Sequence, residues 1–224
     1  MIPRHIAIEG PIGVGKTSLT RRLAAALGAE CLFEGADENP FLPGYYAEPT
    51  RYALATQLHF LCQRTRQLQQ VMQGDFFRSH LIADFMFEKD RLFASIALNN
   101  DEFRLYEDIF ARFAPEVPVP ELVIYLNAPV AILRKRIAQR GIHYEQRIDD
   151  AYLDRLVAVY DDFFYEYKAA PVMFIDAVAV DLVGQPAHFA ALLHAIHTGT
   201  RHLELPEPAG KDSDPRVGEA RLAV

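Results

Sequence analysis

The sequence predicts an α/β fold in which a five-stranded, mainly parallel sheet carries helices on both faces. Five short apolar segments of strand length alternate with longer segments whose apolar residues recur at helical spacing. Alternation of this kind is typical of a parallel sheet buried between two layers of helices. The predicted buried strands are the segment that begins at Ile6 and residues 29–34, 80–84, 121–128 and 171–177.

The first two predicted helices flank the second strand. The first helix begins near Lys16 and ends at Gly28, since glycine readily adopts the positive φ of a helix C-cap. Residues 35–50 are rich in Gly and Pro and predict a loop. Residues 51–73 have helical periodicity over a long span, which predicts a helix that crosses the molecule and ends at Gly74.

The second half of the chain continues the alternation. Residues 85–114 predict two helices that are broken near Asn99 and Asn100. A proline-rich connector at 114–120 leads into the fourth strand, and a helix follows that strand. The last two helices are predicted at about 151–167 and at 186–197.

Length and composition favour one domain. The chain has 224 residues, and its hydrophobic content of 50% suffices for one buried α/β core. We expect this domain over residues 1–200 and a mobile, polar tail over 201–224. The net charge of −7 argues against a broad nucleic-acid-binding surface.

The sequence also predicts a cytoplasmic protein without a membrane partner. The chain enters its first strand at once, with no leader pattern, and has no apolar run of membrane-spanning length. Cys31 and Cys62 lack the spacing of metal ligands. We expect both as buried or half-buried thiols in a reducing compartment.

The turn after the first strand fits G-x-x-x-x-G-K-[ST], a phosphate-binding P-loop. Its glycines let the backbone adopt positive φ and approach an anion, so that successive N–H groups surround phosphate oxygens. Lys16 can reach the β- and γ-phosphates, and the Thr17 hydroxyl can bind Mg²⁺. The sequence therefore predicts a site for a nucleoside triphosphate, taken to be ATP with Mg²⁺. The predicted nucleotide-binding residues are Gly10, Pro11, Ile12, Gly13, Val14, Gly15, Lys16, Thr17 and Ser18.

Two carboxylates end the strands beside this loop. Ligands of parallel sheets collect at the carboxyl ends of the strands, so we expect Glu34 and Asp84 to converge there. Asp84 ends the run L-I-A-D, a Walker-B-like pattern that predicts Mg²⁺ binding with Thr17. Glu34 is suitably placed to take or orient the proton of a phosphoryl-acceptor hydroxyl, although its position alone equally allows a salt-bridge or helix-dipole role.

Cations gather in the helix after the fourth strand, which has Pro129 near its start and Gly141 after its end. Arg136 and Arg140 are four residues apart and share one helix face. Such a pair could close over a transferring phosphoryl group, whereas a solvated helix face is the alternative. The place of this helix after a strand end favours a lid, at about residues 134–147, that also excludes water.

These motifs together resemble the deoxynucleoside kinases, and more narrowly the bacterial deoxyadenosine, deoxyguanosine and deoxycytidine kinase group. The resemblance extends from Ile6 to about Leu193. It implies a P-loop kinase fold with a short arginine-bearing lid and transfer of phosphate from ATP to a deoxynucleoside in nucleotide salvage. The motifs are I-E-G-x-I-G-x-G-K-[ST], E-x-x-x-x-N-P from Glu34, Y-x-x-P-x-x-[YW] from Tyr46 with a following Gln, the carboxylate after the third strand, and R-x-x-x-R followed by Glu.

The resemblance implies roles for residues that carry little signal by themselves. Glu34 resembles the general base that accepts the proton of the sugar 5′-hydroxyl as it attacks the γ-phosphate. Tyr46 resembles the tyrosine that meets the 3′-hydroxyl, and Glu145 resembles its carboxylate partner. Gln57 resembles the glutamine that makes paired hydrogen bonds with the base, for which its amide offers a donor and an acceptor. Asp84 completes the implied substrate site.

The chain departs from the family pattern after the third strand. Many members carry an arginine and a serine after the carboxylate, where this chain has Phe85 and Met86 after Asp84. Lys89 and Arg91, one or two turns further along, are the candidates for the missing charge.

A second departure lies in the lid. Many relatives have a further arginine after the lid glycine, where this chain has Ile142 and His143. We therefore expect Arg136 and Arg140, together with Lys16 of the P-loop, to stabilise the charge of the transition state.

The resemblance favours purine deoxynucleosides, with deoxycytidine next. Gln57 alone cannot choose, because its amide can pair with adenine, guanine or cytosine. Phe41, Phe60 and Phe87 are expected near the pocket and would stack on any base. The apolar surface of the long helices, and the assembly that is common among related kinases, predict a homodimer.

Other functions share some of these features. A thymidylate-type kinase, or another kinase of small metabolites, has the same loop, but a phosphorylated acceptor needs an extra cation near Glu34, and the acidic run at 36–39 argues against one. A regulatory GTPase needs N-K-x-D, which the chain lacks. A non-catalytic ATP-binding module would not be expected to carry the converging carboxylates and lid arginines.

Overall fold

Five strands form one sheet in the order β2-β3-β1-β4-β5, and every neighbouring pair is parallel. The computed structural model describes residues 2–73, 80–114, 117–201, 203 and 205. The prediction of a five-stranded parallel sheet is confirmed, with the P-loop strand at its centre. The strands are β1 His5–Glu9, β2 Glu30–Leu32, β3 Leu81–Ala83, β4 Leu122–Asn127 and β5 Val172–Asp176.

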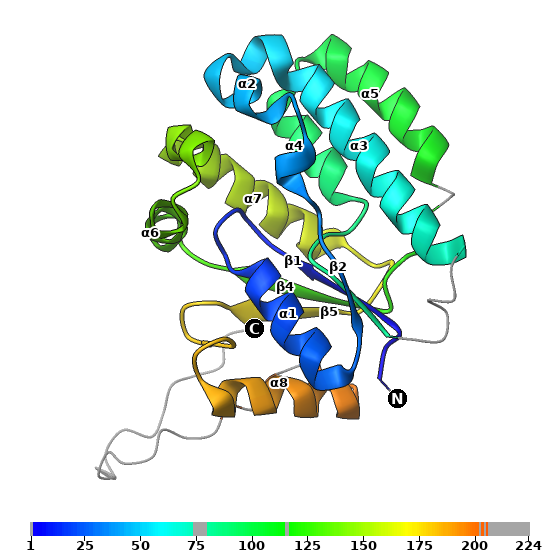
Figure 1. Ribbon diagram of the computed structural model, residues 1–224, viewed down its shortest axis with the longest axis vertical. Coiled ribbons are helices and arrows are strands. Elements are labelled where there is room, and N and C mark those ends of the chain that lie inside the picture. The colour runs from blue at the N-terminus through cyan, green and yellow to red at the C-terminus, as the bar shows by residue number, and fades with distance from the viewer. Residues whose placement is uncertain (1, 74–79, 115–116, 202, 204, 206–224) are drawn as a thin grey trace.

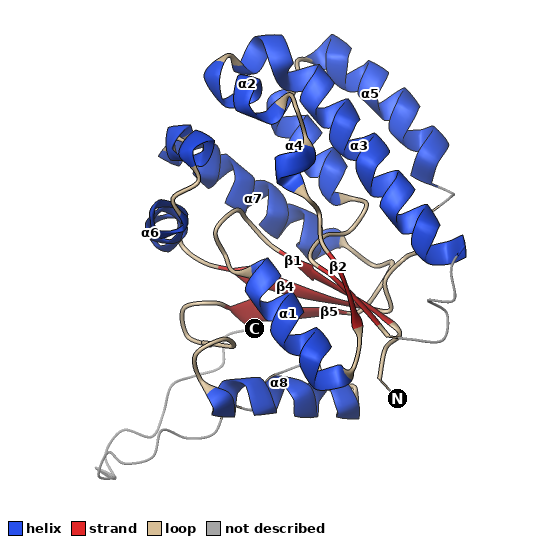
Figure 2. Ribbon diagram, viewed as in Figure 1, coloured by secondary structure: helices blue, strands red, loops and turns tan. Residues whose placement is uncertain are grey.

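Helices cover both faces of this sheet, as predicted. The helices are α1 Lys16–Leu27, α2 Leu42–Ala47, α3 Pro49–Gln73, α4 Lys89–Ala97, α5 Asn100–Phe113, α6 Val130–Arg140, α7 Asp150–Glu166 and α8 Pro186–Thr198. Figure 1 shows α1 and α8 on one side of the sheet and α3, α4, α5 and α7 on the other. Colouring by secondary structure shows the strands as a middle layer between the two sets of helices (Figure 2).

The predicted helix boundaries coincide with local capping chemistry. Gly28 and Gly141 end α1 and α6 in the left-handed region, at φ of 62° and 71°. The break between α4 and α5 falls at Asn99, whose side chain accepts hydrogen bonds from the backbone N–H groups of Asp101 and Glu102. The Glu102 carboxylate accepts in return from the Asn99 N–H, which completes a capping box.

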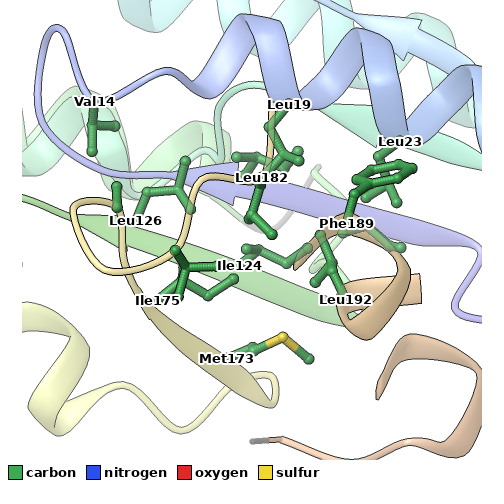
Figure 3. Packing of buried hydrophobic residues seen from close by; sticks show 14 of the residues in the cluster. Val14, Leu19, Leu23, Ile124, Leu126, Met173, Ile175, Leu182, Phe189 and Leu192 are labelled. Carbon is green, nitrogen blue, oxygen red and sulfur yellow. The ribbon is translucent and has the colours of Figure 1, made fainter. Parts of the chain in front are cut away.

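One hydrophobic core fixes the P-loop helix to the sheet. Leu19 and Leu23 of α1 pack with Ile124 of β4 and with Phe189 and Leu192 of α8 (Figure 3). Full burial of one such side chain contributes about 1.5–3 kcal/mol of transfer free energy. The start of α1, and with it the P-loop, is therefore held firmly at the carboxyl end of β1.

The second strand is shorter and more exposed than predicted. The segment at 29–34 was expected to be a buried strand, but β2 is an edge strand in which Glu30 and Cys31 are exposed and Leu32 is half-buried. An edge strand lacks a neighbour on one side, so its side chains keep more contact with water. The expectation of a buried or half-buried thiol is thus wrong for Cys31, whereas Cys62 is half-buried.

The segment predicted as a loop at 35–50 contains helical structure. A 3₁₀ turn spans Ala36–Glu38, α2 follows, and α3 already begins at Pro49. Proline at the start of α2 is compatible with a helix, and burial of Leu42 and Tyr45 against α3 stabilises this short element.

Some predictions concern residues beyond the described ranges. The end of the long helix at Gly74 and most of the tail at 201–224 lie outside them, as do residues 115–116 of the connector. Within the described ranges, no helix has both the length and the apolar character that crossing a membrane requires.

Candidate active site

A cavity of about 900 Å³ opens at the carboxyl ends of the strands. This volume is near the upper end of the range of roughly 300–1,000 Å³ that is typical of small-molecule sites. Ile12 to Ser18 of the predicted nucleotide-binding loop line the cavity, whereas Gly10 and Pro11 are buried and do not line it. The predicted site residues that share its wall are Glu34, Tyr46, Gln57, Asp84, Arg136, Arg140 and Glu145.

The P-loop has the backbone geometry that its glycines permit. Gly10, Gly13 and Gly15 all have positive φ, of 144°, 85° and 110°. A Cβ at Gly10 would lie 2.2 Å from the Leu126 carbonyl oxygen, and one at Gly13 would lie 2.9 Å from Ile137 of α6. Glycine is therefore required at these two positions both by conformation and by the close approach of β4 and α6.

Lys16 begins α1 and bends back over this loop. Its Nζ donates hydrogen bonds to the carbonyl oxygens of Gly10, at 2.7 Å, and of Pro11, at 3.1 Å. Burial and the charge of Lys89 lower the pKa of Lys16 to about 8, against the opposing effect of Glu9. The ammonium thus lies among groups that a bound phosphate could replace as partners.

Thr17 and Asp84 meet at the junction of α1 and β3. The Thr17 hydroxyl donates to Asp84 Oδ2 at 2.6 Å, and the backbone N–H of Glu34 donates to Asp84 Oδ1 at 2.8 Å. A hydroxyl and a carboxylate are the oxygen ligands that Mg²⁺ prefers, and this ion usually takes only one or two protein ligands beside water and phosphate. The pair therefore fits the predicted metal site. Within the described residues, no group of three or more His, Cys, Asp or Glu side chains could hold a metal ion.

Glu34 lies between two buried cations. Arg64 Nη2 donates to its Oε1, and Lys89 Nζ donates to its Oε2 at 2.5 Å. Burial raises the pKa of Glu34, but Arg64 and Lys89 outweigh burial and hold this pKa well below its usual range. The carboxylate is therefore ionised and able to accept a hydrogen bond from a substrate hydroxyl.

Arg64 and Asp90 were not identified from the sequence. Arg64 is 2% exposed and bridges Glu34 to Asp90, which is fully buried at the start of α4. Burial raises the pKa of Asp90 to about 7, although the Arg64 charge opposes this change. The sequence offered one indication of Arg64, which lies two helical turns after Gln57 on the same predicted helix. A cation at such a position fits a solvated helix face equally well.

Of the two candidates for the missing positive charge, only Lys89 lies in this site. Lys89 is 4% exposed and lines the cavity. Arg91 is largely exposed and pairs with Glu107 of α5, with donor–acceptor distances of 2.8 and 3.0 Å. The two positions after Asp84 hold the uncharged residues Phe85 and Met86, and both are buried in hydrophobic cores.

The polar residues expected to bind a nucleoside share the wall of this cavity. Gln57 is 2% exposed, and its Oε1 has no hydrogen-bond partner among the described residues. Tyr46 stacks on Tyr144 with ring centroids 5.7 Å apart. Burial, and then the nearby charge of Glu145, raise the pKa of Tyr46. A buried amide oxygen without a partner is costly, so it suits a ligand that donates a hydrogen bond.

The predicted lid arginines both reach the cavity, but each is held by the protein. Arg136 donates to the carbonyl oxygens of Val14 and Ala177, each at 2.9 Å. Arg140 forms an ion pair with Glu145, which is 8% exposed in the 3₁₀ turn His143–Arg147. These contacts join α6 to the P-loop and to the 3₁₀ turn that follows α6.

The aromatic wall differs from the one predicted. Phe60 lines the cavity, but Phe41 is 38% exposed and contacts His59, and Phe87 stacks on Phe110 in a separate core. Phe41 and Phe87 both lie in turns just before a helix, where tertiary packing decides the direction of a side chain and residue type does not reveal it. The other aromatic residues of the wall are Phe33, Tyr45, Tyr46, Phe93, Tyr144 and Tyr152.

Glu9 is a further residue that sequence reasoning missed. It ends β1, is fully buried, and accepts hydrogen bonds from Gly10 N at 3.1 Å, Met86 N at 2.8 Å and Tyr160 OH at 3.0 Å. Burial raises its pKa, whereas the charges of nearby Lys89 and the P-loop lysine lower it. This carboxylate joins the P-loop to the turn that follows β3.

Comparison with known proteins identifies the family that shares these features. The family model described as deoxynucleoside kinase matches residues 6–200. A deoxyadenosine kinase from Lactobacillus acidophilus is 32% identical over 192 residues, which cover 80% of this chain and 87% of that protein. A deoxyguanosine kinase from Bacillus subtilis is 30% identical over 82% of this chain and 91% of its own length.

A second protein from Bacillus subtilis, a deoxyadenosine/deoxycytidine kinase, is 27% identical over 81% of this chain and 87% of its own length. Among solved structures, the deoxyadenosine kinase from M. mycoides with bound dCMP and dCDP superposes with a TM-score of 0.77. This likeness covers 86% of this chain and 98% of the other at 23% identity, and it supports the fold.

Proposed function

The chain belongs to the deoxynucleoside kinase family and is a phosphotransferase of that class, and we propose that it transfers the γ-phosphoryl group of ATP to the 5′-hydroxyl of a purine deoxynucleoside. The 5′-oxygen forms a bond to the γ-phosphorus, the bond from that phosphorus to the β-phosphate oxygen breaks, and ADP leaves. The hydroxyl proton passes to Glu34. The product is a deoxynucleoside 5′-monophosphate.

The observation that carries this proposal is the position of Glu34. Its ionised carboxylate lines the same cavity as the P-loop residue Lys16 and the unpartnered amide oxygen of Gln57. An acceptor whose base contacts Gln57 and whose hydroxyl contacts Glu34 would extend toward the γ-phosphate of a nucleotide in the P-loop. Catalysis of phosphoryl transfer depends mostly on such positioning and on charge stabilisation.

ATP as donor and Mg²⁺ as its metal are parts of the proposal. The P-loop geometry supports a triphosphate, and the oxygens of Thr17 and Asp84 would hold Mg²⁺. Bound there, Mg²⁺ would neutralise charge on the phosphates. Lys16 and the lid arginines Arg136 and Arg140 would exchange their present carbonyl and carboxylate partners for phosphate oxygens.

The sugar and base would be bound by polar residues of the cavity wall. We assign the 3′-hydroxyl to Tyr46 and Glu145, and the base edge to Gln57. The names of the relatives, which include deoxyadenosine, deoxyguanosine and deoxycytidine kinases, support purines first and deoxycytidine next.

A nucleoside monophosphate kinase is the competing function. Its acceptor would bring a phosphate close to Glu34, and the two cations on this carboxylate, Arg64 and Lys89, could serve that phosphate. Each of these cations already forms an ion pair with a protein carboxylate, which favours a neutral acceptor. A non-catalytic ATP-binding module is disfavoured by the family match over residues 6–200.

We further propose that residues 134–147 act as a lid over the active site. We also propose that the protein is cytoplasmic and forms a homodimer. The two cysteines, Cys31 and Cys62, are free thiols, which is consistent with a reducing compartment. Light scattering at micromolar concentration should give twice the mass of the chain, and a monomer would contradict the assembly.

The deciding experiment supplies the purified protein with MgATP and one acceptor at a time. The acceptors are deoxyadenosine, deoxyguanosine, deoxycytidine, thymidine and their 5′-monophosphates, and both ADP and the phosphorylated product are measured. Turnover of purine deoxynucleosides with inert monophosphates is the expected result. Turnover of a monophosphate alone would replace the proposal by the competing function.

A further inference from the structure

Two cations contact Glu34, and the structure holds them in different ways. Arg64 is clamped between carboxylates, because Nη2 donates to Glu34 and Nη1 donates to Asp90. The Arg64 side chain is 2% exposed, and its guanidinium also lies against the aromatic rings of Phe60 and Phe85. This guanidinium has balanced charge and little freedom to follow a ligand.

Lys89 is also buried, with 4% of its side chain exposed, but it has fewer partners than Arg64. It donates to Glu34 Oε2 at 2.5 Å, and among the described residues its ammonium has no other hydrogen-bond acceptor. An ammonium group carries three N–H donors, so capacity remains for other acceptors. The ring of Phe93, whose centroid is 5.6 Å from Nζ, provides an apolar neighbour but no acceptor.

The cavity that Lys89 lines also contains the phosphate-binding loop. Lys89 lines its wall together with Lys16 of the P-loop, and the charge of Lys89, in addition to burial, lowers the pKa of Lys16. Two like charges in a poorly solvated cavity repel one another. An anion that binds between the two ammonium groups offsets this repulsion. The two cations therefore stabilise a phosphoryl group most strongly at the point of the reaction where its negative charge is largest.

We propose that Lys89 is a catalytic cation that contacts the transferring phosphoryl group, whereas Arg64 only positions Glu34. This inference rests on the proposed kinase function. Lys89 acts through its charge, and Glu34 is the group that takes the acceptor proton. Its charge stabilises the phosphoryl oxygens while the acceptor proton passes to Glu34, which at the same time keeps the ammonium in place.

Three variants test this role. Lys89→Met removes the charge and keeps a side chain of similar length, whereas Lys89→Arg keeps the charge. Arg91→Met removes the exposed cation on the same helix and is the control. We expect Lys89→Met to lower kcat by about 10²- to 10³-fold, as loss of one transition-state donor does. The KM values for ATP and nucleoside should change by no more than about threefold.

Lys89→Arg should restore at least about a tenth of the lost rate, and Arg91→Met should stay within about twofold of the wild type, since exposed ion pairs contribute little. Thermal unfolding of each variant controls for folding. Lys89→Met with a kcat within about threefold of the wild type, or a loss equal to that of Arg91→Met, would overturn the assignment.

A binding experiment separates the charge effect from a structural one. ADP, aluminium fluoride and the nucleoside together mimic the transition state, whereas ADP and nucleoside alone mimic the ground state. We expect Lys89→Met to weaken the first complex by about 10²-fold and to leave the second within about threefold. Equal weakening of both complexes would overturn the catalytic role. If the wild type phosphorylates only monophosphates, the proposed function is refuted. In that case the catalytic role of Lys89 is tested with a monophosphate as acceptor, and full activity of the Lys89 variants would refute that role too.

Discussion

The Glu9 carboxylate accepts a 2.8 Å hydrogen bond from the backbone N–H of Met86, so the strand before the P-loop is tied to the turn after β3. The same carboxylate accepts from the N–H of Gly10 at 3.1 Å. These two bonds fix the phosphate-binding loop relative to the segment that carries Asp84 and Lys89. A fully buried acidic residue thus sets the geometry of a site that it does not line.

Glu9→Gln tests this connection. The amide oxygen can keep the bond from Met86, but the amide NH₂ then faces the Gly10 N–H, which loses its acceptor. We expect the free energy of unfolding to fall by about 1–3 kcal/mol and the KM for ATP to rise. Denaturant unfolding and steady-state kinetics measure both. Tyr160→Phe, which removes only the third donor to Glu9, is the control and should leave the KM for ATP near that of the wild type.

Glu34→Gln should lower kcat by orders of magnitude, because an amide cannot take the acceptor proton. ATP binding, measured by titration calorimetry, should persist. The neutral side chain leaves Arg64 and Lys89 without one partner, so unfolding must be measured in parallel. Glu38→Gln, at a nearby exposed position, should retain full activity. A kcat near that of the wild type for Glu34→Gln would reject the general-base role.

Gly10→Ala should abolish nucleotide binding or folding. A Cβ at this position would lie 2.2 Å from the Leu126 carbonyl oxygen, and φ is 144°. Gly28→Ala is the matched control, because Gly28 also has positive φ but has open space around it. That change should cost about 1 kcal/mol of stability and leave ATP binding intact. Normal ATP binding by Gly10→Ala would contradict the requirement for glycine.

His5 should make the fold sensitive to acid. Burial lowers the pKa of His5 to about 4 from an ordinary value of 6.5, although the charge of Glu121 raises it. Between these two values the unfolded chain binds more protons than the folded one, so stability rises with pH across this window. The contribution is present above about pH 6.5 and is lost as the pH falls to about 4.

His5→Phe should remove this dependence. Neither ring nitrogen of His5 has a hydrogen-bond partner among the described residues, so an apolar ring can replace it. The difference in unfolding free energy between wild type and variant should change by on the order of 2 kcal/mol from about pH 7 to pH 4. Denaturant titrations at several pH values measure this difference, and a constant difference would contradict the prediction.

The errors of prediction have a common origin in side-chain environment. The edge position of β2 exposes Cys31, and packing turns Phe87 into a core away from the cavity. Arg64 and Asp90 have the residue types of ordinary helix-surface charges, but the packing of α3 against α4 buries both. Residue type and periodicity do not state which neighbour an element will have.

The sequence by itself determined the strand–turn–helix unit of the P-loop, the order of the elements and the carboxylates at the strand ends. Each of these follows from local spacing, from glycine conformation or from the rule that parallel strands end at one edge. The pairing of Glu34 with Arg64 and Lys89 was decided only by the tertiary structure. These partners are 30 and 55 residues away from Glu34, and only the order of the sheet and the packing of α3 and α4 bring them together.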